Sequence, residues 1–149
     1  MALTVTRTSL RWAVKESFVR YVATSGGRMS CGNGAQWVEG EFDFAADEAS
    51  SHGESRAFLG DVLFVAHGSL LRVALGLPRI EIVGETAAVS ALTDPLDPTT
   101  RIEIARALRA RAPQDADGRA PWKATLTAEG ARVFGGNYPP GAELAPLRF

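Results

Sequence analysis

Hydrophobic positions alternate with polar positions over much of the chain, which is the period of a half-buried β-strand. The clearest case is the segment 57–67, in which Phe58, Val62 and Phe64 share one face. A histidine-glycine-serine turn follows, and the segment 70–76 alternates again. Together these segments predict a β-hairpin.

Apolar and polar residues also alternate in several other segments, weakly in some of them, and this alternation predicts further strands. Residues 101–113 begin like a strand, although their alanine and arginine content would also suit a helix; the neighbouring strands favour a strand. Residues 26–35 predict a glycine-rich loop with at most one short strand, and residues 137–149 an irregular end or a short strand. The remaining predicted strands are 3–12, 36–47, 78–84, 86–92 and 122–127.

Two segments predict short helices. The first, at about residues 13–24, is followed by two glycines that are typical of a helix end. The second, at about residues 127–135, has Thr127 as its expected N-cap. Helical spacing predicts an inward stripe on the first helix that consists of Val14, Phe18, Tyr21 and Val22.

Many short strands at regular spacing, together with two short helices, predict a mainly β fold, an antiparallel β barrel or sandwich-like domain. The chain has 149 residues, which is enough for one domain with a core of its own. No repeat or low-complexity tract marks a boundary, so we expect a single domain over 1–149.

The composition indicates which kinds of partner the protein is not expected to bind. The net charge is −1 and no basic patch stands out, so no nucleic-acid partner is expected. No stretch approaches the roughly 18 apolar residues of a membrane helix, so no membrane segment is expected. The N-terminus lacks the features of a signal peptide. The chain as given is therefore expected to be cytoplasmic, or extracellular or at the cell surface if an export signal has been removed.

Catalytic motifs are missing from the sequence. No phosphate-binding loop, nucleophile elbow or evident carboxylate pair is present, and we predict no catalytic residue. Cys31 is the sole cysteine, which excludes an internal disulfide. The residues able to bind a transition metal strongly are Cys31, His52, His67 and the two tyrosines. His52 fits a solvated loop residue, and Cys31 a small, partly buried thiol.

Two candidates keep alternative interpretations. His67 ends an apolar strand and precedes a turn, so it should lie at the mouth of the sheet, where spacing alone favours a structural histidine. Tyr21 fits a core aromatic residue whose hydroxyl group needs a partner. Ser17 lies one helical turn earlier on the same face and could supply one.

Four ordered blocks of the sequence resemble the HtaA domain, a haem-binding module of actinobacterial haem-uptake proteins. They span about residues 9–149, and the first and last blocks carry most of the resemblance. The blocks are "LRWAVKESFVRYV", "FLGDVLFVAHGSLLRVAL", "LPRIEIVGETAAVSAL" and "LTAEGARVFGGNYPPGAELAPLRF".

The resemblance implies a β-rich fold with two short helices that binds one b-type haem with ferric iron. It places the axial iron ligand at Tyr21 and the hydrogen-bond partner of that ligand at His67. It also places contacts to the haem propionates at Ser17 and Tyr138. The chain has Asn137 where the family often has an aromatic residue.

The resemblance therefore implies a haem-binding protein for haem acquisition, storage or transfer, with haem and other haem-uptake proteins as partners, and no enzymatic activity. One alternative is a tyrosine-ligated haem enzyme of the peroxidase or catalase type. Another is a β-rich interaction domain that has lost haem binding. The sequence does not predict whether the protein forms a homodimer.

Overall fold

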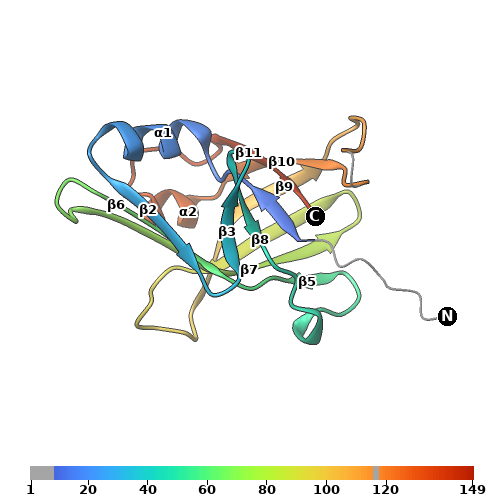
Figure 1. Ribbon diagram of the computed structural model, residues 1–149. Coiled ribbons are helices and arrows are strands. Elements are labelled where there is room, and N and C mark those ends of the chain that lie inside the picture. Colours follow the sequence, from blue (N-terminus) through green and yellow to red (C-terminus); the bar gives the residue numbers. More distant parts are fainter. Residues whose placement is uncertain (1–8, 116–117) are drawn as a thin grey trace.

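The computed structural model describes residues 9–115 and 118–149 and consists mainly of β-strands (Figure 1). The elements in chain order are β1 (Leu10–Trp12), α1 (Glu16–Thr24), β2 (Arg28–Gly32), β3 (Ala35–Val38), β4 (Glu41–Phe44), the 3-10 turn η1 (Glu48–Ser50), β5 (Ser55–Ala57), β6 (Asp61–Ala66), β7 (Leu71–Val83), β8 (Thr86–Leu92), β9 (Arg101–Arg109), β10 (Pro121–Leu126), α2 (Ala128–Val133) and β11 (Glu143–Arg148).

The strands form one 11-stranded sheet in which each pairing is antiparallel. The order is β2-β6-β7-β8-β9-β10-β11-β1-β4-β3, with β5 paired to β7 beside this path. The two end strands, β2 and β3, approach each other, so the sheet is a nearly closed barrel. This confirms the predicted mainly β, antiparallel barrel-like fold with two short helices.

Several strand boundaries differ from the predicted ones. The two strands expected at 70–76 and 78–84 are one long strand, β7, which bends at Leu77 (φ 45°) where its register with β8 shifts. The bend lets Pro78 lie within the strand, because the chain breaks its regular pairing there. The segment 36–47 is a hairpin of β3 and β4, since Glu39 and Gly40 both have positive φ angles of 51° and 84°.

The remaining strand predictions have mixed outcomes. The ambiguous segment 101–113 does form a strand, β9. The predicted loop 26–35 contains β2 and the start of β3, and the C-terminal segment contributes the interior strand β11 between β10 and β1. Of the first predicted strand, Leu10–Trp12 is confirmed as β1, and residues 3–8 lie outside the described residues.

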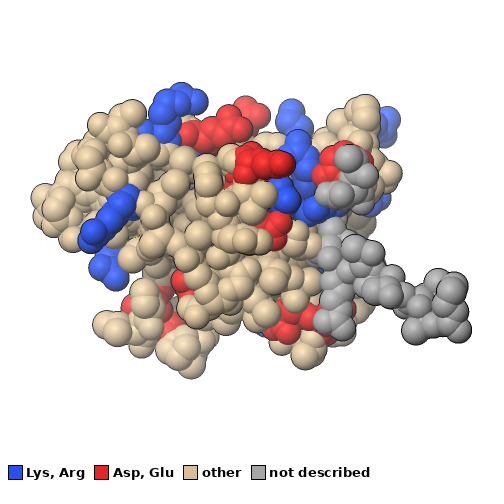
Figure 2. Space-filling model, viewed as in Figure 1, with Lys and Arg blue, Asp and Glu red and all other residues tan. Residues whose placement is uncertain are grey.

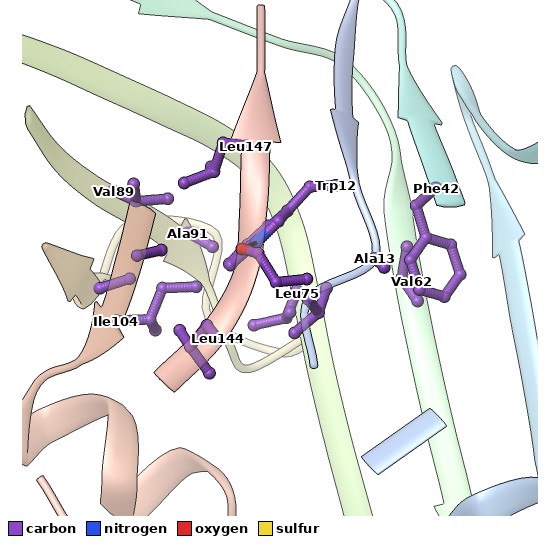
Figure 3. Packing of buried hydrophobic residues seen from close by; sticks show 14 of the residues in the cluster. Trp12, Ala13, Phe42, Val62, Leu75, Val89, Ala91, Ile104, Leu144 and Leu147 are labelled. Atoms are coloured by element: carbon purple, nitrogen blue, oxygen red, sulfur yellow. Dashed lines mark hydrogen bonds between the residues drawn. The ribbon is translucent and has the colours of Figure 1, made fainter. Parts of the chain in front are cut away.

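The barrel core contains aromatic and aliphatic side chains from nearly all strands. Trp12 anchors it: the ring is 1% exposed, and its indole N–H donates to the carbonyl of Ala145 at 2.8 Å. Figure 3 shows this ring projecting among Leu75, Leu144 and Leu147. Burial of large apolar side chains is the main stabilising contribution to such a fold.

The first helix begins later than predicted. Val14 is buried in a left-handed conformation (φ 66°), which turns the chain out of β1, and Lys15 is the N-cap residue. Phe18 and Val22 are buried as predicted. Tyr21 was predicted in the same stripe, but 42% of its surface is exposed. The prediction of a core position for Tyr21 is therefore wrong.

The second helix confirms its predicted cap. The hydroxyl oxygen of Thr127 accepts a hydrogen bond from the N–H of Gly130 at 2.9 Å and donates to the carbonyl of Glu103 at 2.6 Å. A cap of this kind satisfies one of the free N–H groups of the first turn. It also fixes α2 against β9.

Charged side chains of both signs lie next to one another toward the top and upper right of the face in Figure 2, and much of the rest of this face is uncharged. The left-hand end of this face, where Figure 1 places the tip of the β6–β7 hairpin, is mainly uncharged. No helix among the described residues is long and apolar enough to span a membrane.

Candidate functional site

Three segments that are far apart in the sequence meet near one end of the barrel: α1, the β6–β7 turn and the loop after α2 (Figure 1). A Cβ atom at Gly135, in that loop, would lie 4.0 Å from Leu71 Cδ1 at the start of β7. The ring of Phe18 on α1 packs edge-on against Phe134 and Tyr138, with centroid distances of 5.0 and 6.2 Å. The three segments therefore form one surface.

Tyr21 and His67 are paired on this surface. The phenol oxygen of Tyr21 and Nε2 of His67 form a hydrogen bond, although the two residues are 46 positions apart. Their ring centroids are 5.7 Å apart. Both side chains are exposed, so the pair remains accessible from solvent.

The turn that carries His67 has an unusual backbone. His67, Gly68 and Ser69 all have positive φ angles, of 53°, 62° and 75°. The turn is closed by a hydrogen bond from the N–H of Leu70 to the carbonyl of His67 at 3.1 Å. This conformation points the imidazole of His67 toward α1. It also leaves the side chain of Leu70, three residues after His67, 91% exposed.

The close approach of α1 to β6 depends on Gly27. The N–H of Gly27 donates to the carbonyl of Val22 at 3.0 Å, which closes the end of α1 in a Schellman-type turn. A Cβ atom at this position would lie 2.4 Å from the carbonyl oxygen of Val65 and 2.9 Å from Ala66 Cβ. The sequence pattern predicted a helix end here. It did not predict that the glycine brings the helix against the strand that leads into His67.

The variant Gly27→Ala is therefore expected to lower the free energy of unfolding by about 1–3 kcal/mol through overpacking, and to separate Tyr21 from His67. Gly32→Ala is the matched control. Gly32 is also in the β2 region, has no positive φ angle, and would place its Cβ in open space. Urea denaturation of the two variants measures the difference. Equal stability of the two variants would contradict the role assigned to Gly27.

Ser17 and Tyr138 lie near the other end of α1. Ser17 is exposed and is one turn before Tyr21. Tyr138 is partly buried against the core, and its ring meets Phe18 and Phe134 edge-on. Among the described residues, neither hydroxyl group has a hydrogen-bond partner. Both hydroxyl groups are therefore available to a ligand.

Asn137, which precedes Tyr138, has a structural contact. Its side-chain amide donates to the carbonyl of Phe134 at 3.0 Å and thereby closes the turn after α2. A Cβ atom at Gly135 would lie 3.3 Å from this amide, so the asparagine packs tightly over the glycine. Asn137 therefore fixes the loop that positions Tyr138.

The other candidate metal ligands lie elsewhere. His52 is exposed, as predicted, and lines a separate cavity of about 210 Å³ with Arg56 and Phe149. Cys31 is exposed on β2, so the prediction of a partly buried thiol is wrong. In residues 9–115 and 118–149, no group of three or more histidine, cysteine, aspartate or glutamate residues could hold a metal ion.

A larger hollow among the described residues is also separate from the tyrosine–histidine pair. It has a volume of about 550 Å³ and lies on the outer side of β2, β6 and β7, under the loop 92–98. A smaller hollow of about 190 Å³ adjoins His67 and is lined by Gly26, Gly27 and Arg28. The site at Tyr21 is thus an open surface and not a closed cavity.

The model of a protein family described as Htaa matches residues 7–149. The chain belongs to the HtaA family. The match covers nearly the whole chain and confirms the resemblance found in the four sequence blocks. Among curated proteins, no sequence matches the chain.

Solved HtaA and HtaB structures from Corynebacterium glutamicum have the same fold as this HtaA-family chain. The C-terminal domain of HtaA is 25% identical with a TM-score of 0.74, and the comparison covers 99% of this chain and 96% of that one. The N-terminal domain of HtaA is 23% identical with a TM-score of 0.80 and coverages of 98% and 96%. The heme-binding protein HtaB is 19% identical with a TM-score of 0.77 and coverages of 95% and 90%.

Proposed function

We propose that this HtaA-family protein binds one ferric b-type haem through Tyr21 and serves in haem acquisition, storage or transfer. The observation that carries the proposal is the exposed pair of Tyr21 and His67 at the end of α1. The family and the heme-binding neighbour HtaB support haem as the ligand.

The chemistry of the pair suits ferric iron. A phenolate is an anionic oxygen ligand, and tyrosine is one of the known haem ligands. Bound iron would hold the phenolate form, and Nε2–H of His67 is placed to donate a hydrogen bond to the same oxygen.

The surroundings of Tyr21 fit a flat, largely apolar ligand. Leu70 offers an exposed apolar side chain, and Gly68 and Gly136 leave room because a Cβ atom at either would point into open space. The free hydroxyl groups of Ser17 and Tyr138 are suitable donors to carboxylates. An open surface of this kind allows haem to enter and leave without unfolding, which suits transfer to other haem-uptake proteins.

A hemin titration of the purified protein tests the proposal. We expect a sharpened Soret band that saturates at one hemin per chain, with absorption bands of a ferric tyrosinate complex. A spectrum identical to that of hemin in buffer would contradict the proposal and would favour the alternative of an interaction domain that has lost haem binding.

The same complex separates binding from catalysis. We propose that the protein is not an enzyme, and therefore expect the hemin complex to turn over hydrogen peroxide no faster than free hemin. Turnover well above that of free hemin would instead support a tyrosine-ligated enzyme of the peroxidase or catalase type.

A further inference from the structure

Lys15 is a cation without an anionic partner beside the proposed haem site. Its ammonium group donates one hydrogen bond, to the backbone carbonyl of Glu143 at 2.8 Å. The same group lies 4.9 Å from the centre of the Tyr138 ring, in a cation–π contact. Among the described residues, no carboxylate forms an ion pair with it. Two of its three N–H donors are therefore left for another acceptor.

The position of Lys15 is unfavourable for the helix itself. Lys15 is the N-cap residue of α1, and its side chain makes no capping hydrogen bond. Serine, threonine, aspartate and asparagine are preferred there, and a positive charge at a helix N-terminus opposes the helix dipole. Helix stability therefore does not account for a lysine at this position.

Lys15 is, however, placed where the propionate carboxylates of a haem bound at Tyr21 would lie. Lys15 precedes Tyr21 by six residues, a rise of about 9 Å along α1, which is of the order of the reach from a porphyrin's iron to its propionates. Ser17 lies between the two, and Tyr138 lies directly under the ammonium group. The lysine and the two free hydroxyl groups are thus gathered near one end of the helix, and Tyr21 lies nearer the other end.

We propose that Lys15 binds a propionate carboxylate of the ligand by a charge-assisted hydrogen bond, and so selects porphyrins with free carboxylates. This inference rests on the proposed function, because it assumes that the iron is bound at Tyr21. The contacts to Tyr138 and Glu143 hold the flexible side chain in place, so less side-chain entropy is lost when the carboxylate binds. The alternative is a purely structural role, in which Lys15 only ties α1 to β11.

The test compares hemin with hemin dimethyl ester, in which both carboxylates are blocked. The rate of release to excess apomyoglobin is measured for the wild type and for Lys15→Met, Lys15→Arg and Lys123→Met. Lys15 and Lys123 are the only lysines of the chain, and Lys123 is exposed on β10, so its variant is the matched control.

We expect Lys15→Met to release hemin about tenfold faster than the wild type, the order expected for a lost hydrogen bond to a charged group. Lys15→Arg keeps the charge and should stay close to the wild type, as should Lys123→Met. With the dimethyl ester, the wild type should release as fast as Lys15→Met, and the two should no longer differ.

Three results overturn the inference, and they are distinguishable. Hemin that is bound through Tyr21 but released at the same rate from Lys15→Met and the wild type refutes the role of Lys15 and leaves the proposed function standing. A faster release of both hemin and its ester from Lys15→Met shows a structural role instead. Failure of the wild type to bind hemin at all refutes the proposed function together with this inference.

Discussion

Replacing Phe18 with alanine is expected to lower the free energy of unfolding by about 3–5 kcal/mol. The side chain is 1% exposed and lies where α1 meets the barrel. Its ring packs edge-on against Phe64 and Phe134, both at a centroid distance of 5.0 Å. Truncation removes this apolar contact area and leaves a cavity that the rigid sheet cannot close.

The effect should reach the proposed haem site, because Phe18 lies on α1 between Ser17 and Tyr21. Urea denaturation measures the stability, and a hemin titration measures the site. Leu96→Ala is the control, since Leu96 is 92% exposed in a loop and its truncation should change stability by less than about 0.5 kcal/mol. A loss of stability in Phe18→Ala no larger than in this control would refute the anchoring role of Phe18.

Replacing Tyr21 with phenylalanine is expected to weaken hemin binding by at least about 100-fold. The loss of a group that only supports a metal ligand typically costs 10–100-fold, and the loss of the ligand itself should cost more. The variant removes only the hydroxyl group and keeps the ring. Because Tyr21 is exposed, stability should stay within about 0.5 kcal/mol of the wild type.

Tyr138→Phe is the matched control, because the chain has only these two tyrosines. It removes one proposed hydrogen bond to a propionate and leaves the iron ligand in place. Hemin affinity measured by competition with apomyoglobin should therefore fall far less than in Tyr21→Phe. Equal losses in the two variants would contradict the assignment of Tyr21 as the ligand.

The sequence predicts the fold where local signals and tertiary structure agree. The β6–β7 hairpin follows from alternation and a turn, and Thr127 caps α2 as its residue type favours. The bend of β7 at Leu77 was not predictable, because the pairing of neighbouring strands imposes it. The left-handed turn at Val14 was missed for a similar reason, since a β-branched residue disfavours that conformation on its own.

Helical periodicity alone did not predict correctly whether Tyr21 is buried. It lies 60° around α1 from Phe18 at 100° per residue, at the edge of the apolar stripe. Only the neighbouring elements decide whether such an edge residue is buried. In the fold, the buried face of α1 includes Phe18 and Val22 but not Tyr21, whose hydroxyl group forms a hydrogen bond with His67 at the surface.

Which residues form the candidate site could be predicted from the sequence only through the family resemblance. No local pattern connects Tyr21 with His67 across 46 residues, and the hydrogen bond between them appears only in the folded chain. Gly27 and Lys15 were missed as contributors. The sequence pattern gave no signal for Lys15, because it placed this residue inside the helix, and the N-cap position and the contacts to Tyr138 and Glu143 appear only in the structure.

The most direct test of the central claim is a resonance Raman spectrum of the ferric hemin complex, excited in the iron–phenolate charge-transfer band. The claim predicts tyrosinate vibrations in the wild type and in Tyr138→Phe, and their complete absence in Tyr21→Phe. A wild-type complex without tyrosinate vibrations, or the same vibrations in Tyr21→Phe, would contradict the assignment of Tyr21 as the iron ligand.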